Sequence, residues 1–154
     1  MSRTSRSKAF IFSSAQNIES FVDDIAPASE HFGLLLAVDG HSVDSERVRR
    51  VARELIQKGL ASFCVWGPDC EGIHDLFDAA AIELDAEHTK VVIMTTWHDD
   101  ETLEETIWYF MNCAVPDEAC QRTCKDWILA SIASANWEGM IRREFESPLK
   151  LEEN

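Results

Sequence analysis

Short apolar runs recur along the chain, and each is followed by a polar turn and then by a stretch with helical spacing. The clearest run extends from Leu34 to Val38 and ends at Asp39 and Gly40. A continuous apolar run of this length is typical of a strand that is buried on both faces. After the turn, apolar residues recur at three- and four-residue intervals, as on one face of a helix. The pattern therefore predicts a repeating unit of strand, turn and helix.

The same unit returns several times, although its copies share no repeated sequence. The expected strands cover residues 34–38, 61–66, 90–96 and 127–132, with a short additional strand at 9–12. The expected helices cover residues 18–25, 43–58, 73–82, 103–114 and 137–145. A continuous helix over residues 118–133 is the alternative to the last strand, because that stretch fits both patterns.

Alternating strands and helices predict right-handed βαβ units, which place helices on both faces of a mainly parallel sheet. We expect a single three-layer α/β domain with a mostly parallel four- or five-stranded sheet, of the flavodoxin-like or Rossmann-like kind. A chain of 154 residues can build one hydrophobic core without disulfides or a structural metal. Residues 1–8 are basic and serine-rich, and we expect them to form a disordered tail before the domain of residues 9–154.

The stretch from Val91 to Glu101 carries the strongest functional signal, because a predicted buried strand stops there in a turn rich in acids. In an open α/β sheet the carboxyl ends of the strands meet at one edge, where ligands usually bind. The strand-end residues that suit a divalent metal or acid–base catalysis are Asp39, His41, His98 and Asp99. Aspartates after strands are also ordinary helix N-caps, so a structural role fits them equally.

Cys70 and His74 form a second candidate, because Cys70 follows a strand-end turn and His74 lies one helical turn further on. A helix N-terminus favours the thiolate, so the two could act as a nucleophile and its base, although the spacing is common. No turn contains G-x-G-x-x-G, G-x-x-x-x-G-K-[ST] or G-x-S-x-G. A nucleotide cradle and a hydrolase nucleophile elbow are therefore disfavoured, and no cofactor is expected.

The net charge of the chain indicates which classes of partner are favoured. The chain has 28 acidic and 14 basic residues, for a net charge of −14. This charge disfavours nucleic acid and anionic membranes and favours a basic partner protein. Residues 60–121 contain fourteen acids and one base, Lys90. The predicted helix after Asp39 is instead basic, and either it pairs with acids of a neighbouring helix or it forms a second contact patch or a homodimer surface.

An acidic surface that also carries aromatic side chains can both attract and anchor a basic protein. The residues predicted to bind such a partner are Trp97, Asp99, Asp100, Glu101, Glu104, Glu105 and Trp108. The alternative is that the aromatic residues fill the core and that the acids keep the protein soluble.

The five cysteines are odd in number and show no C-x-x-C spacing, so we expect them to be reduced. No apolar run approaches the roughly 18 residues of a membrane span, and the N-terminus lacks the apolar core of a secretion signal. These features predict a cytoplasmic protein.

The segment from Thr96 to Trp108 reads Thr-Trp-His-Asp-Asp-Glu-x-Leu-Glu-Glu-x-Ile-Trp and is followed by Asn112-Cys113-Ala114 and Pro116. This pattern resembles one in uncharacterised bacterial domains of unknown function, which have no activity to transfer. In size and charge the chain is also similar to immunity proteins that neutralise toxic nucleases. That similarity implies an interaction role but identifies no binding residue.

Two functions follow from these patterns. The first is a small acidic interaction module, such as an immunity or defence-system component, that binds a basic protein. The alternative is a metal-assisted hydrolase whose site lies at the carboxyl edge of the sheet, which requires Asp39, His41, His98 and Asp99 to converge. A noncatalytic domain of a larger assembly is compatible with the same sequence.

Overall fold

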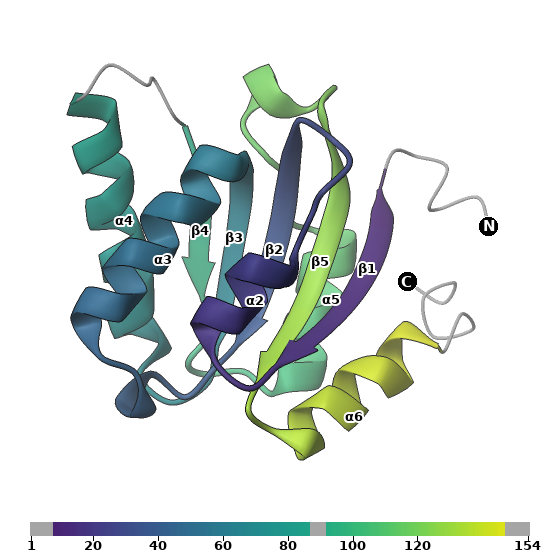
Figure 1. Ribbon diagram of the computed structural model, residues 1–154. Coiled ribbons are helices and arrows are strands. Elements are labelled where there is room, and N and C mark those ends of the chain that lie inside the picture. The colour runs from purple at the N-terminus through teal and green to yellow at the C-terminus, as the bar shows by residue number, and fades with distance from the viewer. Residues whose placement is uncertain (1–7, 87–91, 147–154) are drawn as a thin grey trace.

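A computed structural model of the chain describes residues 8–86 and 92–146. The centre of the protein is a five-stranded parallel sheet with the strand order β1-β5-β2-β3-β4 (Figure 1). The strands are β1 (Ala9–Ala15), β2 (His31–Ala37), β3 (Leu60–Trp66), β4 (Met94–Trp97) and β5 (Cys124–Ile132). The helices are α2 (Ile18–Asp24), α3 (Ser45–Lys58), α4 (Cys70–Ala86), α5 (Leu103–Asn112) and α6 (Ala135–Phe145), with short 3-10 helices η1 (Gly40–Ser42) and η2 (Glu118–Cys120).

Helices cover both faces of the sheet, which confirms the predicted three-layer α/β domain (Figure 1). Helices α2, α3 and α4 pack on one face, and α5 and α6 pack on the other. Successive residues of β2 serve the two layers in turn, since Leu34 and Leu36 face the first and Leu35 and Ala37 face the second. Burial on both faces explains why the central strands are continuous apolar runs.

The C-terminal part of the sequence forms a strand and not the alternative helix over residues 118–133, which is wrong. Residues 124–132 form β5, which pairs with β1 on one side and β2 on the other. Eight of its nine residues are buried. This central position accounts for the apolar run Trp127–Ala130, which has no alternation that could distinguish a strand from a buried helix.

Strand β4 differs most from the expectation of a long buried strand. It has four residues and lies at the edge of the sheet, paired only with β3 among the described strands. Val92 and Met94 are 53% and 46% exposed, and residues 90 and 91 lie outside the described residues. We also expected Ile82 to belong to the apolar stripe of the helix predicted over residues 73–82, and this prediction is wrong, because Ile82 is 70% exposed.

Helix α3 begins and ends at residues whose chemistry fixes its bounds. The Asp44 side chain accepts hydrogen bonds from the backbone N–H groups of Glu46 and Arg47. Gly59 ends the helix with a φ of 115°, in the left-handed region. A Cβ atom at Gly59 would lie 2.2 Å from the carbonyl oxygen of Glu30, so this position requires glycine for space as well.

Lys8 is the first described residue, and the rest of the predicted tail, residues 1–7, lies outside the described part of the chain. Its ammonium group donates to backbone carbonyls at the end of α5, the nearest being Ala114 at 2.8 Å. The same group lies 4.1 Å from the centre of the Trp127 ring. Burial lowers the pKa of Lys8 to about 8. Lys8 therefore joins α5 to the sheet.

The carboxyl ends of all five strands lie at one edge, which is the lower edge in Figure 1. After β1, β2 and β3 the chain turns toward the layer of α2, α3 and α4, whereas after β4 and β5 it turns toward α5 and α6. Neighbouring strands with opposite exits are β1 and β5, β5 and β2, and β3 and β4. Opposite exits open a crevice between strand ends, so the topology provides three places where a ligand could bind.

Candidate functional site

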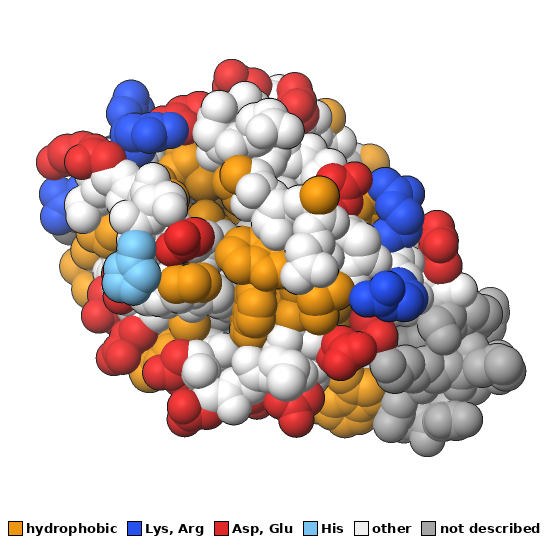
Figure 2. All heavy atoms as spheres, turned by 90° about the horizontal axis from the view of Figure 1, so that it is seen from below, with side chains coloured by type: hydrophobic (Ala, Val, Ile, Leu, Met, Phe, Trp, Pro, Cys, Tyr) orange, Lys and Arg blue, Asp and Glu red, His pale blue; other side chains and the backbone are white. Residues whose placement is uncertain are grey.

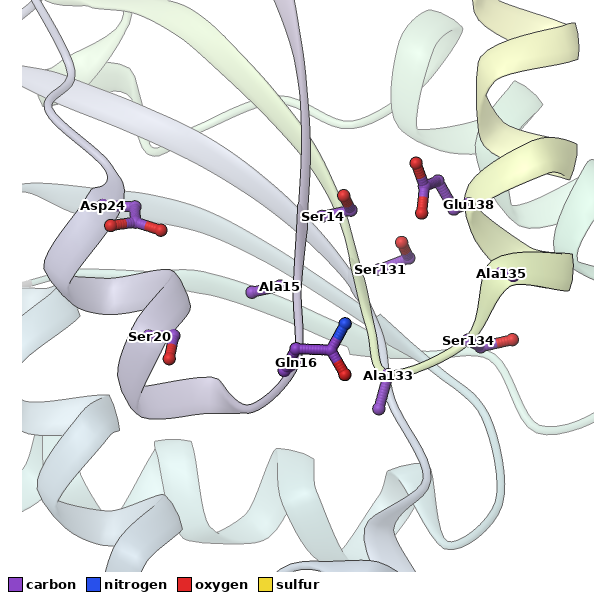
Figure 3. A pocket seen from close by; sticks show the side chains of 10 residues that line it. All are labelled: Ser14, Ala15, Gln16, Ser20, Asp24, Ser131, Ala133, Ser134, Ala135 and Glu138. Atoms are coloured by element: carbon purple, nitrogen blue, oxygen red, sulfur yellow. The ribbon is translucent and has the colours of Figure 1, made fainter.

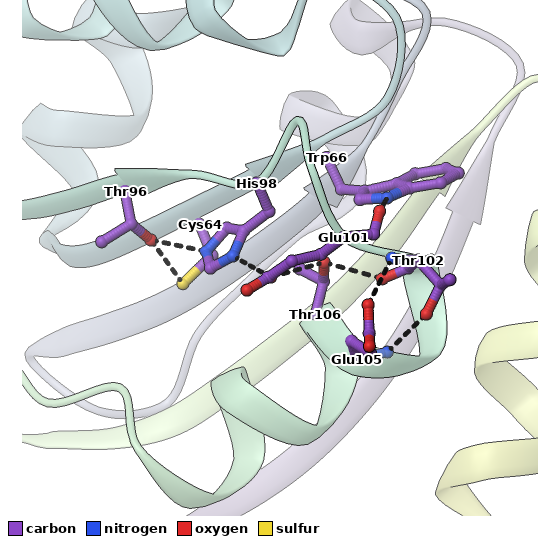
Figure 4. Close-up of polar contacts among 8 residues, drawn as sticks. All are labelled: Cys64, Trp66, Thr96, His98, Glu101, Thr102, Glu105 and Thr106. Carbon is purple, nitrogen blue, oxygen red and sulfur yellow. Dashed lines mark hydrogen bonds and ion pairs between the residues drawn. The ribbon is translucent and has the colours of Figure 1, made fainter.

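The crevice between β3 and β4 is occupied by the protein's own side chains (Figure 4). His98 follows β4 and is 7% exposed. Its Nδ1 lies 2.6 Å from the Glu101 carboxylate, and its Nε2 lies 2.8 Å from the Thr96 hydroxyl. The Thr96 hydroxyl in turn donates to the sulfur of Cys64 at 3.3 Å. Both ring nitrogens of His98 are therefore engaged inside the protein.

Glu101, in the turn before α5, contacts residues on both sides of this crevice. Its carboxylate contacts His98, and its backbone carbonyl accepts a hydrogen bond of 2.8 Å from the indole of Trp66 (Figure 4). The Thr102 and Glu105 side chains then form a capping box, in which each bonds to the other's backbone N–H. These contacts fix the direction in which α5 leaves the sheet.

Asp39 and His41 lie at the end of β2, two strands away from His98. The Asp39 carboxylate accepts from the backbone N–H of His41 and from the hydroxyl of Ser42, each at 3.0 Å. It thus serves as the N-cap of η1, while His41 is exposed. Asp99 is exposed in the turn after His98. The four catalytic candidates are therefore not brought together: Asp39 and His98 belong to two separate contact networks, and His41 and Asp99 are exposed.

Within residues 8–86 and 92–146, no group of three or more His, Cys, Asp and Glu side chains has the arrangement of a metal site. The described contacts join His98 to Glu101 and Asp39 to Ser42, and none joins the two strand ends. The geometry thus gives no support to the convergence that the hydrolase prediction requires.

His74 forms a separate network on the opposite face of β4. Its Nε2 lies 3.0 Å from the Thr95 hydroxyl, and its Nδ1 lies 3.1 Å from the Asp75 carboxylate. The Thr95 hydroxyl also donates to Asp78 at 3.1 Å. Cys70, its predicted partner, is 1% exposed, and burial raises the pKa of its thiol. A raised pKa opposes the nucleophile role that the spacing of Cys70 and His74 had indicated.

Some of the acids predicted to bind a partner make contacts within the protein, whereas others are exposed and make no ion pair in the described part of the chain. Glu101 and Glu105 are used inside the turn and the capping box, as described above. Asp99, Asp100 and Glu104 are exposed and make no ion pair within the described part of the chain.

The two predicted aromatic anchors lie in different layers. Trp97 is 41% exposed and its ring centre is 4.6 Å from that of His74, on the α4 side. Trp108 is 38% exposed on α5, in the other layer. Trp97 is therefore the aromatic anchor that lies next to the acidic turn at the strand edge.

The other two crevices, on either side of the end of β5, remain open. The β1/β5 hollow has a volume of about 510 Å³. Its walls come from the ends of β1 and β5, from α2 and from the start of α6 (Figure 3). The residues lining it are Ser14, Ala15, Gln16, Ser20, Asp24, Ser131, Ala133, Ser134, Ala135 and Glu138.

The β2/β5 hollow has a volume of about 250 Å³ and shares Gln16, Ala133 and Ser134 with the β1/β5 hollow. Apolar side chains such as Val38 and the indole of Trp137 form much of its wall. Its other lining residues are Asn17, Ile18, Asp39, Ser42, Val43, Arg47 and Ile132.

Sequence reasoning missed most of the residues around these hollows. Asp39 was identified, but Gln16, Ser131 and Glu138 have no motif or charge cluster to mark them. The rule that ligands bind at strand ends, applied to residues 9–15 and 124–132, could have pointed to them. Locating the hollows also requires the strand order, which cannot be read from the sequence.

The protein is thus an α/β protein with a parallel sheet. Two crevices at the strand ends, the β1/β5 and β2/β5 hollows, are open, and the third, between β3 and β4, is filled by side chains. A family model described as "Domain of unknown function (DUF7684)" matches residues 15–148, and the chain belongs to that family. A search of curated proteins finds no match to this chain. In the described part of the chain, no helix combines the length and apolar character needed to cross a membrane.

Proposed function

We propose that this protein is a small interaction module that binds a basic partner protein through the carboxyl edge of its sheet. The observation that carries the proposal is the group of exposed acids Asp99, Asp100 and Glu104, which have no cationic partner in the described chain. Carboxylates left without an internal partner attract a cationic surface over several ångströms and raise the rate of association.

Aromatic side chains beside the acids supply the short-range part of the interaction. Trp97 ends β4 directly before the acidic turn and is 41% exposed. Figure 2 shows the strand-end edge, with hydrophobic side chains at its centre and acidic side chains along much of its border. An apolar centre inside a polar rim is the usual arrangement of a protein interface. A role as an immunity or defence-system component would use such a surface.

Helix α3 is rich in arginine, but the contacts of these arginines give little support to a second contact patch on this helix. Arg47 donates to Glu19 of α2, with one nitrogen–oxygen distance of 2.6 Å, and Arg53 lies 3.3 Å from Glu83 of α4. These arginines neutralise acids of neighbouring helices. Arg47 and Arg53 are therefore already engaged within the protein and are less available to a second partner.

The test compares two charge-reversed variants of the tagged full chain. Asp99→Lys/Asp100→Lys alters the proposed surface, and Glu30→Lys/Glu118→Lys makes the same change of net charge at the opposite edge, before β2 and in η2. Each protein is used to capture partners from an extract of its native host at low and at high salt.

The expected result is a stoichiometric basic protein that the wild type and Glu30→Lys/Glu118→Lys retain at low salt and that Asp99→Lys/Asp100→Lys loses. High salt should release it from the wild type and from Glu30→Lys/Glu118→Lys, because the attraction is screened. Retention that is equal for all three proteins, or the absence of any basic partner, would overturn the proposal.

A further inference from the structure

The β1/β5 hollow has the charge of a cation site. Two carboxylates, Asp24 and Glu138, are among the ten residues that line it, and none of the ten is lysine or arginine. Arg142 lies 3.5 Å from Glu138, on the exposed surface of α6, and does not line the hollow. An anionic ligand would meet these carboxylates and the net charge of −14, so the hollow disfavours phosphate and carboxylate groups.

A buried hydroxyl in the wall of the hollow lacks a partner. Ser131 is 1% exposed, and its Oγ has no hydrogen-bond partner within the described part of the chain. Leaving a buried hydroxyl unpaired is unfavourable, so such groups usually meet a water or a ligand. Ser131 is paired in register with Ser14 of β1, which lines the same hollow.

The oxygen atoms on the α6 side of the hollow are directed into a common space. Figure 3 shows Ser14, Ser131 and Glu138 on that side of β1, with Asp24 on the other side. Glu138 is in the first turn of α6, where the helix begins at its Ser134 N-cap. One carboxylate and two hydroxyls can together accept several hydrogen bonds, so a ligand with several N–H donors suits them.

We propose that the β1/β5 hollow binds the guanidinium group of an arginine side chain presented by the basic partner, an inference that rests on the proposed function. A guanidinium carries five N–H donors in a planar fork and a positive charge, which suit the Glu138 carboxylate and the hydroxyls beside it. The arginine thereby gives Ser131 the partner that it lacks.

The hollow and the acidic turn can act in one interface. They lie at the same edge of the sheet, and four strand spacings separate β1 from β4. That distance is about 19 Å, which a contact surface of standard size covers. Asp99 and Asp100 then attract the basic partner, and Glu138 and Ser131 hold one of its side chains.

The experiment measures amide chemical shifts of the isotope-labelled full chain during titration with N-acetylarginine amide. N-acetylcitrulline amide is the matched control, because it has nearly the same shape and no charge. We expect saturable shifts at Ser14, Gln16, Ser131 and Glu138 with the arginine compound and none at the same concentration of the citrulline compound.

Three variants separate the hollow from its surroundings. Glu138→Gln should weaken binding of the arginine compound by about tenfold, because it removes the charge-assisted hydrogen bond. Ser131→Ala should weaken binding by at least about twofold without lowering the melting temperature, since the unbound hydroxyl has no partner to lose. Asp39→Asn alters the neighbouring β2/β5 hollow, keeps an acceptor for the N-cap of η1, and should leave binding unchanged.

Equal binding of the citrulline compound would overturn the assignment of a cation site. Shifts confined to Asp99 and Asp100, shifts spread over the acidic surface, or no shifts at all would overturn the assignment to this hollow. If capture of a basic protein succeeds while this titration fails, the proposed function stands and the hollow is not its arginine site. If the titration succeeds and capture fails, the hollow binds a guanidinium and the proposed function is wrong.

Discussion

At the scale of single residues, His98 shows how a candidate catalytic side chain can have all its polar atoms engaged in contacts within the fold. Its two ring nitrogens face Glu101 and Thr96, and its ring centre lies 5.0 Å from that of Tyr109. The sequence indicated a polar residue at a strand end, which was correct. It could not indicate that Glu101, three residues later, would fold back and engage the same ring.

The coupling between Thr96 and His98 can be measured by a double-mutant cycle. Thr96→Val removes the hydroxyl that contacts His98 Nε2 at 2.8 Å, so it should lower the free energy of unfolding by about 1–3 kcal/mol. His98→Leu should have a cost of similar size. Urea denaturation of the double variant should show a loss smaller than the sum of the single losses by about 1 kcal/mol, because neither partner is then left unpaired. Additive losses would mean that the two groups do not stabilise each other.

At the scale of elements, the central strands were predictable because burial on both faces leaves a direct mark on the sequence. β2 and β3 contain the apolar runs that the sequence analysis identified. β4 was predicted too long, since an apolar sequence does not reveal that its strand lies at an edge. β5 was ambiguous, because only its pairing with β1 and β2 decides between a strand and a helix.

A pair of glycine substitutions tests how closely β2 and β5 are packed. A Cβ atom at Gly33 would lie 2.3 Å from the ring of Trp127, which is 1% exposed and is the register partner of Gly33. Gly33→Ala should therefore destabilise the protein by about 1–3 kcal/mol in thermal or urea unfolding.

Gly139 is the matched control, because it lies in α6 and a Cβ atom there would have no heavy atom within 4 Å. Gly139→Ala should stabilise the protein by about 0.5–1 kcal/mol through its higher helix propensity. If Gly33→Ala proved as harmless as Gly139→Ala, the close approach of Trp127 to β2 would be wrong.

At the scale of the whole molecule, the rule that ligands bind at strand ends identified the correct edge but not the open crevices. The crevices depend on β5 lying between β1 and β2 while its chain exits toward the opposite layer. That arrangement is a property of the tertiary fold. The neutral residues Gln16 and Ser131 acquire their place in the hollow only through it.

The net charge of −14 also acts on the whole molecule, and two opposing effects of salt can be compared. Salt screens the repulsion among acids, which stabilises the fold, and it screens exposed ion pairs such as Arg53 with Glu83, which destabilises it. Exposed pairs contribute about 0–1 kcal/mol each, even where Arg47 lowers the pKa of Glu19 to about 2. Repulsion should therefore be the larger effect.

We expect the melting temperature to rise by roughly 2–6 °C between about 20 mM and about 500 mM NaCl, as measured by calorimetry. Each Asp→Lys or Glu→Lys reversal adds two charges, so both Asp99→Lys/Asp100→Lys and Glu30→Lys/Glu118→Lys change the net charge from −14 to −10. Both variants should show the same shallower rise, since repulsion depends on total charge, whereas only the first should lose the partner. A melting temperature that falls with salt would mean that the ion pairs dominate. A shallower rise in only the first variant would mean that the repulsion is local to the acidic turn.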